Sequence, residues 1–277
     1  MLAASFCFAV MAAAAKSISP SLSAAQIVFV RSLAGSLVLA LLMIKTKVSF
    51  IGREPKILAA RGVVGFTALI LYFWTISKID LGTAVMLNYT APIFAVIAAT
   101  LLFKEKTALA TKLAICASFI GVYFLITPQL ALKPLPLAAG LLSGLLAGIV
   151  HVLIRYSHEE EAPLTIIFYF TFVSTIASGL LLLKTGFVMP EPRDWMGLFA
   201  VTAFALLGQL GLTHSLRSAA VSVVSPFGYL TPVIGAFLGW WIWREALSPL
   251  SLLGSALIVL CGILMYRHLT RQESMLP

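Results

Sequence analysis

Apolar residues follow one another along this chain in long blocks that are separated by short polar breaks. Each block is about 20 residues long, and a helix of that length crosses a hydrocarbon core of roughly 30 Å. A soluble domain does not need this spacing. The pattern therefore predicts ten transmembrane helices, at Leu2–Ile18, Leu22–Ile44, Ile57–Ile76, Leu81–Phe103, Ala108–Ile126, Leu135–Ile154, Leu164–Leu183, Trp195–Thr213, Ala219–Trp243 and Leu250–Tyr266.

The fourth and ninth blocks share a sequence pattern. The stretch Tyr-Thr-Ala-Pro at 89–92 and the stretch Tyr-Leu-Thr-Pro at 229–232 both lead into an apolar run. Each run ends in a basic and an acidic residue, Lys104-Glu105 and Arg244-Glu245, and every matched position is offset by 140 residues. A constant offset indicates an internal duplication. We interpret the adjacent opposite charges as helix ends with local pairing.

Each copy of this duplication holds five predicted helices. Because five is odd, the second copy enters the membrane from the opposite side, and the copies are inverted repeats related by a pseudo-two-fold axis. Prolines at 128, 134 and 136 predict a loop at Thr127–Pro134 between the copies. The sequence thus predicts an all-α membrane protein of ten transmembrane helices in two inverted five-helix repeats, residues 1–127 and 134–268, with a cytoplasmic tail at 269–277.

Composition agrees with a chain that is solvated mainly by lipid. Hydrophobic residues make up 61% and charged residues only 10% of the sequence, and the mean hydropathy is +1.04. The net charge is +9, but the basic residues stand singly or in small groups at block ends, without the continuous basic face of a nucleic-acid-binding protein. We therefore expect no nucleic-acid partner.

The distribution of Lys and Arg predicts the orientation. With a cytoplasmic N-terminus, the cytoplasmic side carries twelve basic residues and the other side six, so we expect both termini in the cytoplasm. The twelve are Lys45, Lys47, Arg53, Lys56, Arg61, Lys104, Lys106, Lys112, Arg155, Arg217, Arg267 and Arg271; the six are Lys16, Lys78, Lys133, Lys184, Arg193 and Arg244.

Arg31 is the one basic residue well inside a predicted span, where a cation costs several kcal/mol unless it faces protein, water or a partner. It is a candidate substrate-binding residue that lines a cavity, or else a structural contact to backbone carbonyls. Lys16, at the end of the first span, is a second candidate, although an end charge that snorkels to the interface explains it as well. Arg61 is expected at the interface, with Gly62 and Gly65 allowing close helix approach.

Prolines within the fourth and ninth spans free backbone carbonyls at membrane depth, where transporters build binding sites. The candidate kink or gating residues are Pro92, Pro226 and Pro232. Side chains near them could bind a substrate through hydrogen bonds or aromatic stacking. These candidates are Trp74, Asn88, Tyr89 and Tyr229.

His151 and His214 lie near the ends of spans and could carry a proton, or else form interfacial hydrogen bonds. No Asp or Glu lies inside a predicted span, which disfavours a carboxylate proton relay or a sodium site built from carboxylates. The three cysteines have no metal-ligand spacing, so we expect no metal site and no cofactor.

No P-loop, HExxH, GxSxG or dinucleotide-binding motif is present, and the spans lack a catalytic cluster. We therefore expect no enzyme; an intramembrane enzyme and a non-transporting scaffold are the alternatives to transport. Gly140, Gly144 and Gly148 form a face that permits close helix contact, within the chain or between two copies, so the protein is expected to be a monomer or a homodimer.

The chain resembles the EamA type of the drug/metabolite transporter superfamily over nearly its whole length. The resemblance rests on the two five-span halves, Lys16, Arg31 within FVRSLAGSLVLALL, the segment 61–65, and the blocks YTAPIFAVIAATLLFKEK and YLTPVIGAFLGWWIWREA. It implies ten helices, a central cavity between the halves, and alternating access that moves small metabolites or drugs. The second half departs from the pattern because Phe170 or Thr171 stands where an equivalent of Arg31 is expected.

These features together predict an integral transporter for a small molecule, in contact with the lipid bilayer and placed in a bacterial inner membrane. The predicted cavity carries positive charge and aromatic surface, which suits anionic, zwitterionic or ring-containing metabolites. Uptake of a nucleotide-like or vitamin-like compound and export of amino acids or drugs both remain open.

Overall fold

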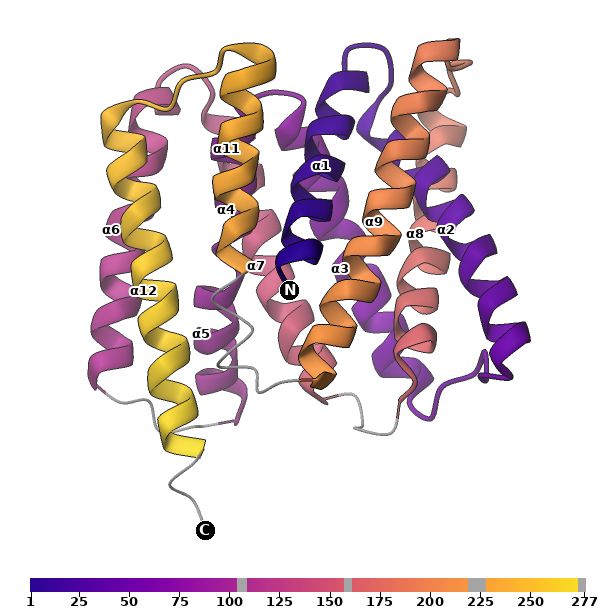
Figure 1. Cartoon of the computed structure of the whole chain (residues 1–277), viewed down its shortest axis with the longest axis horizontal. Coiled ribbons are helices and arrows are strands. Elements are labelled where there is room, and N and C mark those ends of the chain that lie inside the picture. Colours follow the sequence, from indigo (N-terminus) through magenta and orange to yellow (C-terminus); the bar gives the residue numbers. More distant parts are fainter. Residues whose placement is uncertain (104–108, 157–160, 219–227, 274–277) are drawn as a thin grey trace.

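The computed structural model describes residues 1–103, 109–156, 161–218 and 228–273. In this described part the chain forms eleven helices and no strand (Figure 1). The helices are α1 (Leu2–Ile18), α2 (Ala24–Thr46), α3 (Pro55–Ile76), α4 (Leu81–Asn88), α5 (Ala91–Phe103), α6 (Leu109–Leu130), α7 (Pro134–Tyr156), α8 (Pro163–Thr185), α9 (Pro192–Ser218), α11 (Leu230–Trp243) and α12 (Pro249–Glu273).

Helices α2, α3, α6, α7, α8 and α9 contain segments of 19 to 23 residues that are long and apolar enough to cross a membrane. Shorter apolar segments lie at Leu2–Ile18, Leu81–Ala95, Leu230–Trp243 and Pro249–Leu264. Five helices begin at a proline, where the missing N–H removes only a donor that has no partner in the helix. Helix α2 instead begins after Ser23, whose hydroxyl accepts a hydrogen bond from the N–H of Gln26 at 3.3 Å.

The fourth predicted span is not one continuous helix, which corrects the expectation for Leu81–Phe103. It is divided into α4 and α5 at Tyr89 and Thr90. The Thr90 hydroxyl turns back to the carbonyl oxygen of Leu87 at 2.6 Å, and Pro92, the second residue of α5, has no N–H to continue the helical ladder. Pro232 likewise stands in the first turn of α11. Pro226 lies outside the described residues.

The predicted loop at Thr127–Pro134 is also shorter than expected. Helix α6 continues to Leu130 and contains Pro128, because a proline close to the end of a helix interrupts few hydrogen bonds. Helix α12 extends to Glu273, into the segment that the sequence pattern assigns to a tail.

The helices pack in pairs that bring distant parts of the chain together. Close pairs are α6 with α12, α1 with α9, α3 with α7, α2 with α8, and α4 with α11. Figure 1 shows α6 and α12 at one side of the bundle and α2 at the other. Helices α1 and α11 finish at the same end of the bundle, which we call the Lys16 end; α3 begins at the opposite end.

The glycine face of α7 packs within the chain, against the break between α4 and α5. A Cβ atom at Gly148 would lie 2.7 Å from the carbonyl oxygen of Ala91, and one at Gly140 would lie 2.8 Å from the side chain of Leu87. Gly144 faces Thr90 and the Leu87 carbonyl just as closely. Any side chain on this face would push α7 away from the break, so the intrachain use of the three glycines is confirmed.

Candidate functional site

Arg31 lies inside the bundle with 5% of its surface exposed. It is the eighth residue of α2, and so stands about 10 Å along the helix from its first residue. Its guanidinium carbon lies 5.7 Å from the ring centroid of Phe170 on α8. Within the described residues, its buried Nε and Nη1 atoms have no hydrogen-bond partner, and it forms no ion pair. It is a desolvated cation, and two of its three guanidinium nitrogen atoms have no hydrogen-bond partner in the described part of the chain.

Arg61 on α3 reaches the same aromatic ring, which corrects the expectation of an interfacial charge. Its side chain is 6% exposed, and its guanidinium carbon lies 4.9 Å from the Phe170 centroid. Nη1 donates to the carbonyl oxygen of Ile166 at 3.1 Å, whereas Nε is buried without a partner. Gly65 makes this approach possible, because a Cβ atom there would lie 3.0 Å from the Phe170 ring.

Phe170 and Arg31 occupy equivalent places in the two halves. Each is the eighth residue of a 23-residue helix, and α2 and α8 pack against each other. If the second half carried an arginine here, two cations would face each other at this helix pair. The aromatic ring instead offers its negative face to both guanidinium groups.

A small pocket opens beside Arg31 between α2, α8 and α9. Thr171 and Thr202 contribute hydroxyls, but each already donates to a carbonyl of its own helix, at 3.0 and 2.8 Å respectively. The guanidinium of Arg31 is therefore the charged donor that the pocket offers. The lining residues are Arg31, Gly35, Ile167, Phe170, Thr171, Thr202, Ala205, Leu206 and Gln209.

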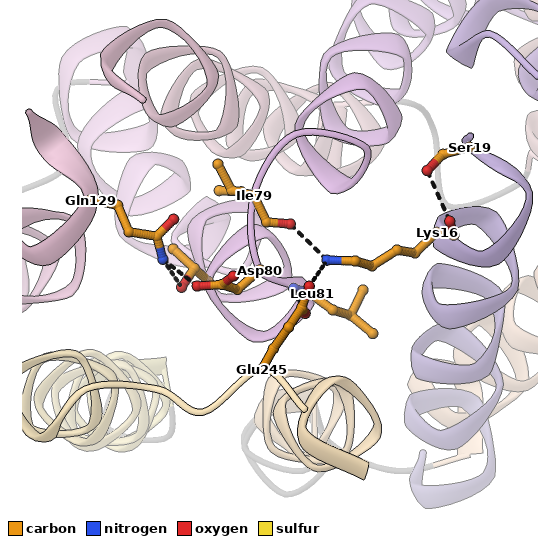
Figure 2. Close-up of polar contacts among 8 residues, drawn as sticks. Lys16, Ser19, Ile79, Asp80, Leu81, Gln129 and Glu245 are labelled. Carbon is orange, nitrogen blue, oxygen red and sulfur yellow. Dashed lines mark hydrogen bonds and ion pairs between the residues drawn. The ribbon is translucent and has the colours of Figure 1, made fainter. Parts of the chain in front are cut away.

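Lys16 lies in a second polar region, at the end of the bundle where α1 finishes. Figure 2 shows its ammonium group between the carbonyl oxygen of Ile79, 2.8 Å away, and the carboxylate of Glu245, with which it forms an ion pair. The ammonium nitrogen also lies 5.6 Å from the ring centroid of Trp243. The other carboxylate oxygen of Glu245 accepts the N–H of Leu81, the first residue of α4, at 2.9 Å.

The turn after α11 directs the Glu245 side chain toward Lys16. Arg244 adopts a left-handed conformation with φ 58° and ψ 28°, and the N–H of Glu245 returns to the carbonyl oxygen of Gly239 at 3.2 Å. Glu245 therefore pairs across the bundle with Lys16, which corrects the expectation that it pairs locally with Arg244.

The same region includes Asp80 and Gln129. The Gln129 Nε2 atom donates to Asp80 at 2.5 Å and also lies 3.4 Å from the hydroxyl oxygen of Thr83 (Figure 2). The Lys16 cluster, defined as Lys16, Asp80, Gln129 and Glu245, thus ties together the ends of α1, α4, α6 and α11.

The other candidate residues do not gather around Arg31. Asn88 donates to the Ser143 hydroxyl on α7 at 3.2 Å, and the Tyr89 hydroxyl donates to Thr231 on α11 at 2.8 Å. Tyr229 is buried against Gly262 of α12. Trp74 is half-buried on α3 and His151 is exposed on α7. The side chain of His214 lies outside the described residues.

Sequence reasoning missed the place of Arg61 and the partner of Glu245. The glycines that follow Arg61 were predicted to allow close helix approach, but they did not identify the Phe170 ring as its neighbour; the repeat had already drawn attention to Phe170 and Glu245. Within the described residues, no three His, Cys, Asp or Glu side chains are grouped closely enough to hold a metal ion.

Comparisons with known proteins give this geometry a context. The sequence model of the EamA-like transporter family matches residues 1–127 and 135–267. The pseudopaline exporter CntI of Pseudomonas aeruginosa (strain UCBPP-PA14) is 32% identical over 266 residues, covering 95% of this chain and 93% of the exporter. An uncharacterized transporter of Helicobacter pylori (strain 26695) is 30% identical, covering 95% of this chain and 92% of its own.

More distant similarity extends to a riboflavin transporter of Vibrio cholerae, which is 24% identical over 197 residues and covers 69% of this chain and 64% of the relative. A solved crystal structure superposes with a TM-score of 0.67 over 98% of this chain and 97% of that chain, at 17% sequence identity. At this identity the superposition establishes a shared fold and nothing about cargo.

Proposed function

Because the chain belongs to the EamA-like transporter family and is a multi-pass integral membrane transporter, we propose that it carries a small organic anion across the membrane, with Arg31 binding the anionic group. The family and its named relatives are transporters, which argues against an enzyme. We propose a binding site that is smaller than the sequence suggested, centred on Arg31 and Phe170, with Asn88 and Tyr89 holding neighbouring helices together.

One observation carries the proposal. Arg31 is 5% exposed, and its buried Nε and Nη1 atoms have no protein partner in the described part of the chain. Burying a cation with unused donors costs free energy, and an anionic ligand would recover it through charge-assisted hydrogen bonds. The lining of the pocket beside Arg31 is mainly apolar, with Thr171, Thr202 and Gln209 as its other polar members. In the conformation described here the pocket has room for about one water molecule, so the proposal requires the helices around Arg31 to separate before a carboxylate with an apolar or flat body binds.

Alternating access between two inverted five-helix halves is the mechanism that we propose. The helix contacts support this mechanism, because a contact between two helices of different halves has a counterpart between the two equivalent helices. The contact of α1 with α9 corresponds to that of α7 with α3, and the contact of α2 with α9 corresponds to that of α8 with α3. A repeat related by a pseudo-two-fold axis produces this correspondence.

The Lys16 cluster suits the closed side of such a carrier. It joins α1 and α4 of the first half to α11 of the second by an ion pair and a backbone hydrogen bond. We propose that this cluster holds the Lys16 end shut in the conformation described here. Opening that end requires Lys16 and Glu245 to separate.

Export is the direction that we propose, since the exporter is 32% identical over nearly the whole chain while the riboflavin transporter is 24% identical over part of it. We place the protein in a bacterial inner membrane with both termini in the cytoplasm, because the basic residues gather on that side of the sequence pattern. The Lys16 end is then the extracytoplasmic end.

The test of anion binding is the thermal unfolding of purified protein with benzoate, phthalate, succinate or citrate, and with benzamide as the neutral control. A ligand that binds only the folded state raises the midpoint of unfolding. We expect at least one carboxylate to raise it, benzamide not to, and Arg31→Met to abolish the shift. Arg193→Met removes an exposed positive charge at the Lys16 end and serves as the matched control.

Flux of the strongest carboxylate into vesicles that contain the purified protein then tests transport. Equal stabilisation by benzamide, or a carboxylate shift that survives Arg31→Met, would contradict the proposal.

A further inference from the structure

Arg61 is the second buried cation of the bundle interior, and the pocket does not reach it. Its guanidinium contacts the Phe170 ring, yet Arg61 is absent from the residues that line the pocket. Phe170, which Arg61 contacts, is one of the residues that line the pocket. Among the described residues Arg61 forms no ion pair, and its buried Nε atom has no hydrogen-bond partner.

A packing role does not explain an arginine at this place. Among the described residues, Arg61 makes one hydrogen bond, from Nη1 to the Ile166 carbonyl, and contacts the Phe170 ring, although a guanidinium carries five N–H donors. Two guanidinium groups against one ring also repel each other, since their carbon atoms lie within about 11 Å of each other by way of the ring centroid. An apolar side chain would fill the space without the cost of a second desolvated charge.

The two arginines stand toward opposite ends of the bundle. Helix α2 begins at the Lys16 end, and Arg31 is about 10 Å along it. Helix α3 begins at the other end, and Arg61, its seventh residue, is about 9 Å along it. A solute that crosses the bundle interior therefore meets one guanidinium nearer to each end, with Phe170 touching both.

We infer that Arg61 is a second anion-binding station, and that Phe170 separates it from the station at Arg31, so that a carboxylate is held by one guanidinium and then by the other during transport. This inference rests on the proposed function, because it needs an anionic cargo. In this inference, Arg31 binds the cargo first, in the pocket, and Arg61 binds it afterwards, as the cargo moves through the bundle.

The experiment compares binding with transport in four proteins: the unchanged chain, Arg31→Gln, Arg61→Gln and Arg61→Lys. The probe is whichever of benzoate, phthalate, succinate and citrate stabilises the unchanged protein most. Its dissociation constant is measured on purified protein in detergent, and its exchange across vesicles is measured as KM and kcat. Elution as a single folded species controls for loss of structure.

We expect Arg31→Gln to weaken binding of the probe at least tenfold. Arg61→Gln should leave the dissociation constant within threefold of the unchanged protein and lower kcat for exchange at least tenfold, and Arg61→Lys should restore a substantial part of that kcat. A structural role for Arg61 would instead reduce folded protein and binding together, and it would overturn the inference.

Phe170→Ala supplies the second arm, because it removes the wall between the stations. In that background the pocket extends to Arg61, so Arg61→Gln should now weaken binding by at least fivefold. If Arg61→Gln leaves kcat unchanged, or weakens binding as much as Arg31→Gln does in the unchanged background, there is one station and the inference is wrong. If no carboxylate stabilises the unchanged protein, the proposed function itself fails.

Discussion

The bundle holds basic side chains in two different ways. The ammonium group of Lys16 has three favourable contacts: an ion pair with the Glu245 carboxylate, a hydrogen bond to the Ile79 carbonyl and a cation–π contact with the Trp243 ring. The guanidinium of Arg31 is more deeply buried; it contacts the Phe170 ring, and its Nε and Nη1 atoms have no hydrogen-bond partner within the described residues. The first arrangement ties helices together and the second leaves a charge to be neutralised.

We interpret this difference as the difference between a structural cation and the proposed substrate-binding cation. A partly buried cation with good partners stabilises the fold, and removing one partner exposes the cost of desolvating the other. A buried cation with unpaired hydrogen-bond donors costs the fold stability, and in the proposed function Arg31 recovers this cost when it binds the cargo. The two regions should therefore respond to neutralising substitutions with opposite changes in the free energy of unfolding.

Removing Glu245 should produce the largest loss of stability. Glu245→Ala leaves the half-buried Lys16 ammonium without its counter-charge and takes the acceptor away from the N–H of Leu81. We expect the free energy of unfolding to fall by about 3 kcal/mol, measured by denaturation of the purified protein in detergent. The double change Lys16→Met with Glu245→Met should cost clearly less, because no unpaired charge remains; an equal or greater loss would contradict a structural ion pair.

Neutralising Arg31 should have the opposite signature. Arg31→Met removes a desolvated cation and keeps a long apolar side chain, so the midpoint of unfolding without ligand should stay the same or rise. Exchange of the carboxylate across vesicles should fall at least tenfold, equivalent to about 1.4 kcal/mol in the activation free energy. A fall in the unfolding midpoint as large as that of Glu245→Ala would assign Arg31 to structure and would erase the contrast between the regions.

The smallest effect is expected at the other end of α4, where Tyr89 donates to Thr231. Tyr89→Phe removes this neutral hydrogen bond between α11 and the α4–α5 junction and should lower the free energy of unfolding by about 1 kcal/mol. Thr231→Val should cost a similar amount, and the double variant little more than either. Additive losses would show that the two hydroxyls act independently.

Much of the helical organisation could be predicted from apolar block length, because lipid leaves few alternatives to a helix of about 20 residues. A kink at Pro92 was predicted, but a break between two helices at Tyr89 and Thr90 was not. The side chain of Thr90 and the glycine face of α7 complete the break, and their contact joins segments more than 50 residues apart. Such contacts leave no local trace in the sequence.

The candidate site was predicted in part. Arg31 could be found because a charge deep inside an apolar block needs a reason. Arg61 could not be separated from an ordinary interfacial charge, since it stands near the start of its helix and the ring that it contacts belongs to α8. Lys16 was identified as a binding candidate, yet its partner Glu245 is 229 residues away and depends on the left-handed turn at Arg244.

Phe170 in the place of a second Arg31 has a kinetic consequence for the proposed carrier. In the absence of a membrane potential, a carrier that is not coupled to an energy source must have the same ratio of maximal rate to half-saturating concentration on both faces. The individual constants are free to differ, and a symmetrical duplicate would make them alike. Replacing one arginine by a phenylalanine removes that symmetry, so the cargo should saturate the two faces at different concentrations, while the electrochemical gradient of the anion decides its net movement.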